Sequence, residues 1–177
     1  MAVALSSGDP AREQRPRVLI GGVGYRWLRD ASFGLVVSDR LATMTWPDRI
    51  RVDDLGYGAI YAGQDIAAFA PDRLILLAGH ERGREPGRLY RYQWQPVTCK
   101  AEELQARIRE AGAGVIDLDH LLLIAHHFKQ LPPSVSLFEV EPVEKAGGEA
   151  LSPAVAELVP SVIRVVREEA LAIAQEA

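Results

Sequence analysis

The side chains best suited to chemistry are an acid in a glycine-rich turn and two histidines beside apolar segments. The acid is Asp30, in the stretch GGVGYRWLRDASFG (21–34), where the next residue is Ala31 rather than a second acid. His80 follows the apolar run LILLA, and His120 lies near the start of DLDHLLLIAHHF. Imidazole and carboxylate groups together form a common ligand set for divalent metal ions. These residues are therefore candidates for a metal or substrate site.

The remaining polar candidates have simpler interpretations. His126 and His127 lie two turns beyond His120 on one predicted helix, near the end of the helix where cations are favoured. The pair Asp53 and Asp54 ends a predicted strand, where adjacent side chains point to opposite faces of the sheet. A turn-capping role is therefore expected for one of these two acids.

No familiar nucleotide-binding or nucleophile motif is complete. The glycine turn has Trp27 where a dinucleotide loop needs a third glycine, and no phosphate-loop lysine motif occurs. Ser32 and Ser38 are not set in a Gly-x-Ser-x-Gly motif. Cys99 has no histidine near it in the sequence, so we interpret it as a structural thiol.

The elements that must position the candidates alternate between strand and helix. Strands are predicted at RVLIGG (17–22), RIRVDDL (49–55), DRLILLA (72–78), RLYRYQW (88–94) and SVSLFEVEP (134–142). Helices are predicted over 31–44, 60–70, 101–112, 117–131 and from 152 almost to the end. In the last helix Ser152 is the expected N-cap, Pro153 is at the first helical position and Pro160 is a predicted bend.

This alternation predicts an α/β protein, a three-layer αβα sandwich. Its sheet is expected to have about five twisted, mostly parallel strands, with helices on both faces. Ligands of such sheets bind at the carboxyl ends of the strands, which here are the loops after Ile20, Val52 and Leu77.

Composition narrows the class of protein further. The 177 residues are 48% hydrophobic with a net charge of −4, which predicts one domain over 17–177 after a mobile tail over 1–16. The arginines are spread along the chain, which argues against nucleic-acid binding. The longest apolar runs are far shorter than the roughly 20 residues of a membrane helix. Cys99 is the only cysteine, so no intrachain disulfide can form, which suits a reducing cytoplasm.

The order of these pieces resembles the nickel–iron hydrogenase maturation endopeptidases. In that family a strand and glycine turn lead to an acidic pair and a glycine; GVGYRWLRDASFG lies in the same register here, with Ala31 in place of the second acid. The other matching motifs are VDDLGYG, DRLILLAGHERGREPGRLYRY, DLDHLLLI and EALSPAVAEL, which together cover roughly residues 17–166. The resemblance implies a phosphorylase/hydrolase-like fold. It also implies a role in removing the C-terminal extension of the hydrogenase large subunit after nickel insertion.

The resemblance also implies where the family's nickel-recognising side chains would lie. Its three positions correspond to Ala31, Ala78 and His120 of this chain, so two of the three carry methyl groups. A methyl group has no lone pair for a metal ion, and one imidazole alone holds nickel weakly. Loss of the metal site is one interpretation. Relocation of the ligands to Asp30, His80 and His120 is the other.

Three functions remain open on this evidence. A catalytically degenerate relative would bind, and assist the maturation of, a hydrogenase large subunit or a related metalloprotein precursor, with no tightly bound cofactor. An active relative would be an endopeptidase that depends on nickel carried by its substrate. The third is an unrelated α/β enzyme or small-ligand binder. The expected partner surface consists of Tyr25, Glu81, Arg82 and Arg84, while no nucleic acid or membrane is expected as a partner.

Overall fold

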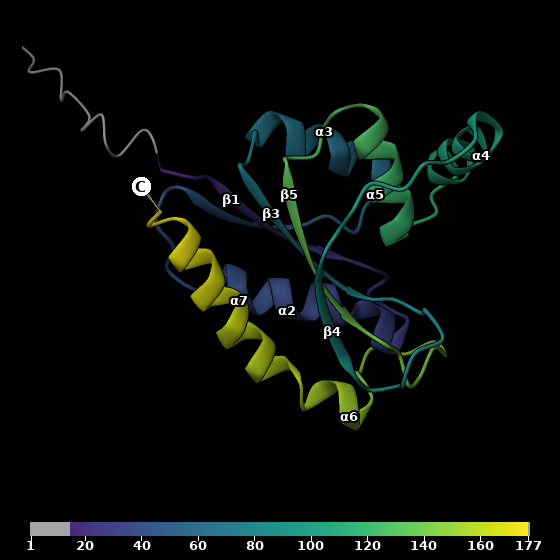
Figure 1. The fold of residues 1–177 in the computed structure, drawn as a ribbon. Coiled ribbons are helices and arrows are strands. Elements are labelled where there is room, and N and C mark those ends of the chain that lie inside the picture. The colour runs from purple at the N-terminus through teal and green to yellow at the C-terminus, as the bar shows by residue number, and fades with distance from the viewer. Residues whose placement is uncertain (1–14, 177) are drawn as a thin grey trace, which may run out of the picture.

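One five-stranded sheet forms the centre of the computed structural model, which describes residues 15–176 (Figure 1). The strands are β1 Val18–Val23, β2 Ile50–Asp54, β3 Arg73–Gly79, β4 Leu89–Gln93 and β5 Ser134–Val140. Their order is β2-β1-β3-β5-β4, and only β4 is antiparallel to its neighbour. Runs such as LILL in β3 are buried because helices cover both faces of the sheet.

The helices divide between the two faces of the sheet (Figure 1). One face carries α3 Ala59–Phe69 and α5 Leu118–His127, with α4 Ala101–Gly112 packed beside them. The other face carries α2 Phe33–Ala42 and α7 Val159–Ile173. Each face has its own apolar core, one packed against α3 and α5 and the other against α2 and α7. The predicted αβα sandwich is therefore confirmed.

The C-terminal helix differs from its prediction. In place of one bent helix there are two, a short α6 (Pro153–Ala156) and the long α7, which has Pro160 in its first turn. Proline has no amide hydrogen to donate, so it is tolerated at a helix start and not in a helix interior. The expected N-cap, Ser152, makes no capping hydrogen bond with its side chain.

The parallel register brings the ends of β1 and β3 side by side, since Val23 is the partner of Ala78. The chain leaves β1 through a turn and a short 3-10 helix, η1 (Arg29–Ser32), before it enters α2. The candidate site residues that follow β1 and β3 in the sequence therefore lie together, at the carboxyl ends of these strands.

Among residues 15–176 no helix is long and apolar enough to span a membrane. The tail predicted over 1–16 falls outside this range except for its last two residues.

Candidate functional site

A cleft of about 410 Å³ lies at the carboxyl ends of the strands. It is lined by the turn after β1, the end of β3 and its loop, and the residues that lead into α5. Ala31 and Ala78 both line it, together with His80 and Asp117. Ligand sites of open α/β sheets lie at this edge, so the cleft is the candidate functional site.

Two glycines let the turn pack closely against the strands. Gly24 has φ of +150°, and a Cβ there would lie 2.0 Å from the carbonyl oxygen of Ala31. A Cβ on Gly79 would lie 1.8 Å from the carbonyl oxygen of Asp30. Neither contact leaves room for a side chain. The backbone of residues 30–31 is thus pressed against the ends of β1 and β3.

Asp30 faces away from the cleft and is fully buried. Its carboxylate accepts hydrogen bonds from the backbone N–H groups of Val143, Glu144 and Ser152, at 2.7 to 2.9 Å. It also accepts one from the hydroxyl of Ser152, at 2.8 Å, which explains why that hydroxyl does not cap α6. These bonds fasten the turn to the segment 143–152, so the geometry argues against Asp30 as a relocated metal ligand.

His120 is also buried, and both of its ring nitrogens face carboxylate oxygens. Nε2 lies 2.6 Å from Glu110, which belongs to α4, and Nδ1 lies 2.9 Å from Asp117. The hydrogen bond from His120 lowers the pKa of Glu110 below its usual range. Asp117 is the N-cap of α5, because its side chain accepts a hydrogen bond from the backbone N–H of His120. It is one of the two acids, Asp117 and Asp119, that could cap this helix according to the sequence. A metal ion could reach His120 only if one of these carboxylates moved.

His80 lies in the cleft and is held between two acids. Its Nδ1 is 3.7 Å from Asp117 and its Nε2 is 3.4 Å from Asp119. Burial alone would lower the pKa of His80, but the hydrogen bond and charge of Asp119 raise it above the ordinary value. Burial likewise opposes ionisation of Asp119, yet His80 and Arg82 hold the pKa of that carboxyl far below its usual range. Asp117 thus links the two histidines, since it contacts both.

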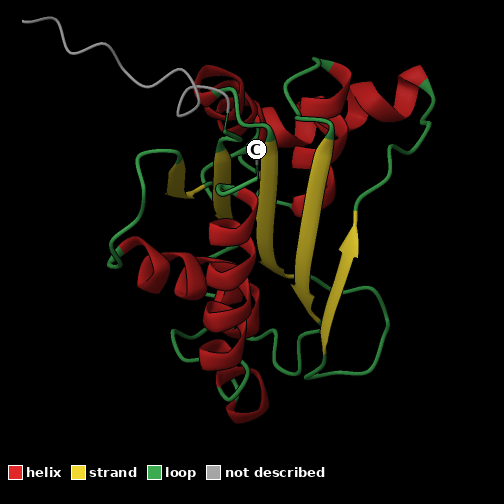
Figure 2. Cartoon of the chain, turned by 60° about the vertical axis from the view of Figure 1, so that its left-hand side comes forward, coloured by secondary structure: helices red, strands yellow, loops and turns green. Residues whose placement is uncertain are grey.

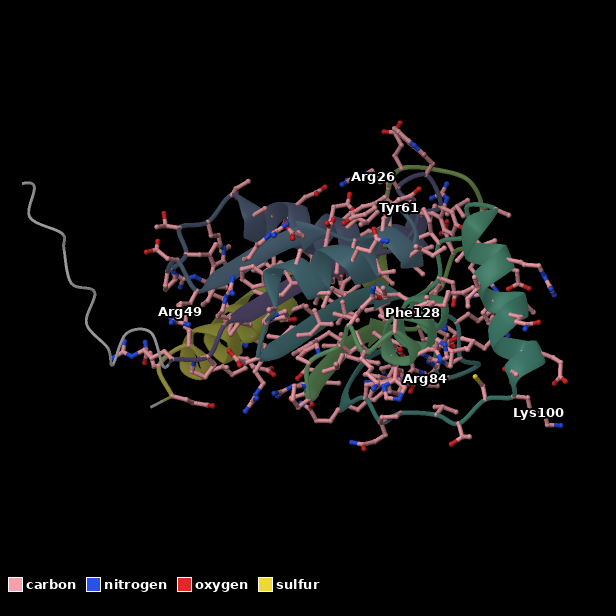
Figure 3. The ribbon with its side chains drawn as sticks, turned by 90° about the horizontal axis from the view of Figure 1, so that it is seen from above. Arg26, Arg49, Tyr61, Arg84, Lys100 and Phe128 are labelled. Atoms are coloured by element: carbon pink, nitrogen blue, oxygen red, sulfur yellow. The ribbon has the colours of Figure 1, made fainter. Side chains whose placement is uncertain are left out.

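Arg82 and Arg84 form part of the protein's own framework. Arg82 contacts Asp119 at 2.7 Å and Glu139 at 2.9 Å, while Arg84 contacts Glu139 at 2.7 Å and Glu141 at 3.2 Å. Glu139 is completely buried and Glu141 almost so. Figure 3 shows Arg84 within a crowd of side chains, whereas Lys100 projects outward beside α4. The two arginines therefore fasten their loop to β5 instead of standing free for a partner.

The other two expected partner residues lie at the cleft itself. The hydroxyl of Tyr25 accepts the backbone N–H of Ile116 at 2.7 Å, so this ring closes one wall of the cleft. Glu81 is exposed and pairs with Lys145 at 2.5 Å. Both members of that pair line the cleft, one from the loop after β3 and one from the segment 143–152.

The side chains that line the cleft are of two kinds, apolar ones that we call its floor and charged ones that we call its wall. Ala31 and Ala78 belong to the floor, and His80 with Asp117 to the wall. Across residues 15–176 no three acid, histidine or cysteine side chains are grouped so that they could hold a metal ion. Sequence reasoning missed Glu110, Glu139 and Glu141 as members of this neighbourhood. The available signal was the pair of acids, Glu139 and Glu141, in the otherwise apolar run SVSLFEVEP.

Comparison with solved structures places this fold among known proteins. The chain is 28% identical to a hydrogenase 2 maturation peptidase from a Thaumarchaeota archaeon, with 86% of this chain and 97% of that one covered and a TM-score of 0.60. HybD, the hydrogenase maturating endopeptidase of E. coli, is 21% identical, with 86% and 93% covered and a TM-score of 0.64. The [NiFe] hydrogenase maturation protease HycI of Thermococcus kodakarensis is 18% identical, with 92% and 99% covered and a TM-score of 0.67. No protein-family model and no curated protein matches the sequence.

The fold is therefore that of the hydrogenase maturation endopeptidases. The chain shares this fold with them, as its order of motifs predicted.

Proposed function

We propose that this protein is a non-proteolytic relative of the maturation endopeptidases, which binds a nickel–iron hydrogenase large subunit or a related metalloprotein precursor and assists its maturation. It would do so in the cytoplasm and without a tightly bound cofactor. The observation that carries the proposal is the floor of the cleft. Two of the positions that correspond to nickel-recognising side chains are Ala31 and Ala78, and both line the cleft.

The surroundings of His120 support the same proposal. This imidazole, at the third position, is held between Glu110 and Asp117 and does not line the cleft among the described residues. A histidine that contacts carboxylates with both nitrogens stabilises the junction between α4 and α5. With no oxygen donors from the floor, nickel carried by a precursor would gain few ligands from this protein.

The preserved packing around the cleft supports retention of binding. The Asp30 carboxylate fastens the turn, and the cleft keeps both polar and apolar walls. A polypeptide segment could therefore be held in the cleft without being cut. Recognition would depend on shape, on the Glu81–Lys145 pair at the cleft and on the apolar floor.

The test is to mix the purified protein with nickel-loaded large-subunit precursors from the organism that encodes it. Size-exclusion chromatography measures complex formation, and intact-mass spectrometry measures removal of the C-terminal extension. We expect a complex and an unshortened precursor. A shortened precursor would contradict the absence of proteolysis, and no complex with any precursor would contradict the proposal as a whole. Ala31→Trp, at the less buried of the two alanines that line the cleft, would fill the cleft and should abolish the complex.

An active nickel-dependent endopeptidase is the second candidate, because His80 lines the cleft two residues beyond Ala78. In that case nickel on the precursor would be recognised by relocated ligands, with the imidazole of His80 in place of a lost carboxylate. His80→Ala would then abolish removal of the extension. Under the first proposal the same variant leaves the precursor uncut and its complex intact.

A further inference from the structure

A second and larger cavity lies away from the floor of the cleft. This groove, of about 600 Å³, runs between β4 with its extension to α4 and the helices α4 and α5. Its apolar side chains are Tyr92, Trp94, Val97, Leu122 and Leu123. Val97 is 67% exposed and Tyr92 37% exposed, so the groove presents apolar surface to solvent.

The strand beside the groove has an open edge. β4 is last in the sheet order, and Figure 2 shows no helix or strand beyond it among the described residues. Trp94 donates its backbone N–H to the carbonyl of Val135 on β5. Along an antiparallel strand, every second residue directs its backbone N–H and C=O toward the neighbouring strand. Tyr92 and Tyr90 therefore face β5 as Trp94 does. The backbone groups of Leu89, Arg91 and Gln93 point outward, away from the sheet. Three residues therefore offer unpaired donors and acceptors along one line.

The open edge and the groove lie side by side, which gives an added strand two kinds of contact. Main-chain hydrogen bonds to the outward groups of Arg91 and Gln93 would fix the direction and register of such a strand. Alternate side chains of a strand point to one face of the sheet. On the face of Tyr92 and Trp94, those side chains would lie over the groove.

The charges of the groove define the chemistry of the added strand. Four charged residues line it, and their signs balance: Arg82, Arg107, Glu103 and Asp119. Arg82 is already paired with Asp119, and Arg107 with Glu110 at 3.2 Å. Glu103, the fourth charged residue, is exposed to solvent, where an ion pair with a bound peptide would be worth little. An apolar side chain would instead contact Trp94, Val97 and Leu123.

A second copy of this chain is a poor occupant of the edge. Two β4 strands paired antiparallel about Arg91 would place these two arginines directly opposite each other, and like charges there are destabilising. Charged residues on edge strands serve to prevent such self-pairing. Arg91 contacts Glu169 at 2.7 Å, so it lies on the α7 face and leaves the groove face unobstructed.

We propose that β4 and its groove bind an extended, uncharged peptide segment of another protein, which adds to the sheet as a sixth strand and places an apolar side chain against Trp94 and Val97. This site is separate from the cleft. The argument for it uses neither the maturation function nor any metal, so it stands or fails independently of the proposed function.

The experiment selects peptides from a random library displayed on phage and tests the synthetic peptides by calorimetry against variants. Arg91→Pro removes the outward N–H without removing a bond to β5, and it should raise Kd at least about tenfold. Arg91→Ala keeps that N–H and is the matched control, with an expected change of less than about threefold. Val97→Asp, at an exposed groove position, should also raise Kd at least about tenfold.

Amide hydrogen exchange on the unaltered protein gives a readout that does not depend on any variant folding. Peptide binding should slow exchange at Arg91 and Gln93 by at least about tenfold and leave the residues around Ala31 unchanged. Failure to select peptides with Kd below about 100 μM would overturn the proposal. So would binding that is indifferent to Arg91→Pro, or protection confined to the cleft.

Discussion

Two neighbouring regions of this molecule differ in their acidic side chains. The floor of the cleft has methyl groups, Ala31 and Ala78, where the family resemblance implies carboxylates. Immediately around it, buried acids are numerous and fully engaged, with Asp30 bonded to backbone amides and Glu139 to arginines. Two positions that line the cleft carry methyl groups, while the buried acids that hold the loops in place are fully hydrogen-bonded or paired.

This contrast separates two uses of a carboxylate. An acid that accepts several hydrogen bonds inside the protein contributes to stability, and its removal leaves buried donors without partners. An acid directed into a cleft contributes little to stability and can be replaced by alanine without structural cost. The comparison predicts large effects from changes at the buried acids and small ones at the floor.

The largest effect is expected at Asp30. Asp30→Ala would leave three backbone N–H groups and the hydroxyl of Ser152 without their acceptor. We expect a loss of about 3–5 kcal/mol in the free energy of unfolding, measured by urea denaturation. The matched control is Asp39→Ala, which removes an exposed acid paired with Arg26 and should cost less than about 1 kcal/mol. Similar losses for the two variants would show that Asp30 does not fasten the turn.

Glu139 is expected to have the next largest effect. Glu139→Gln would remove the buried charge that Arg82 and Arg84 share, while keeping the volume of the side chain. We expect a loss of about 2–3 kcal/mol in unfolding free energy and faster amide exchange in the loop 80–88. Glu85→Gln, which removes an exposed partner of Arg88, is the control and should change the stability by less than about 0.5 kcal/mol. A stable variant with an unchanged loop would refute the framework role of the arginines.

Restoring oxygen donors at the floor tests the other half of the comparison. The double variant Ala31→Glu and Ala78→Asp should gain weak nickel binding that involves His120, provided that Glu110 or Asp117 moves away from the imidazole. With 1 mM nickel and a Kd of about 100 μM, the gain in unfolding free energy would be about 1.4 kcal/mol. Addition of His120→Ala should abolish it. If nickel stabilises the unaltered protein to the same extent, the floor positions are not what decides metal binding.

The sequence predicts the fold better than it predicts these contacts. Continuous apolar runs such as LILLA identify buried strands directly, whereas Pro160, predicted as a bend in one helix, lies in the first turn of a separate helix. The partners of Asp30 are 113 to 122 residues away in the chain, so no local pattern indicates them. The same is true of Glu139, whose arginines lie 55 to 57 residues earlier. His80 and His120 both contact Asp117, and this link depends on side-chain geometry that no sequence pattern indicates.

The smallest effect concerns the pH dependence of the pair formed by His80 and Asp119. The raised pKa of His80 means that its contribution to stability is complete below the unfolded value of about 6.5 and is lost as the pH rises through the folded value. The lowered pKa of Asp119 means that its contribution is present above about 4 and is lost as the pH falls through the folded value. The pair is therefore most stabilising between about pH 4 and 6.5. Because Asp119 is 54% exposed, His80→Gln should cost about 0.5–1 kcal/mol at pH 5.5 and less at pH 8.5, by urea denaturation. His127→Gln, at an exposed position outside the cleft, is the control, and a cost for His80→Gln that grows with pH would contradict the pairing.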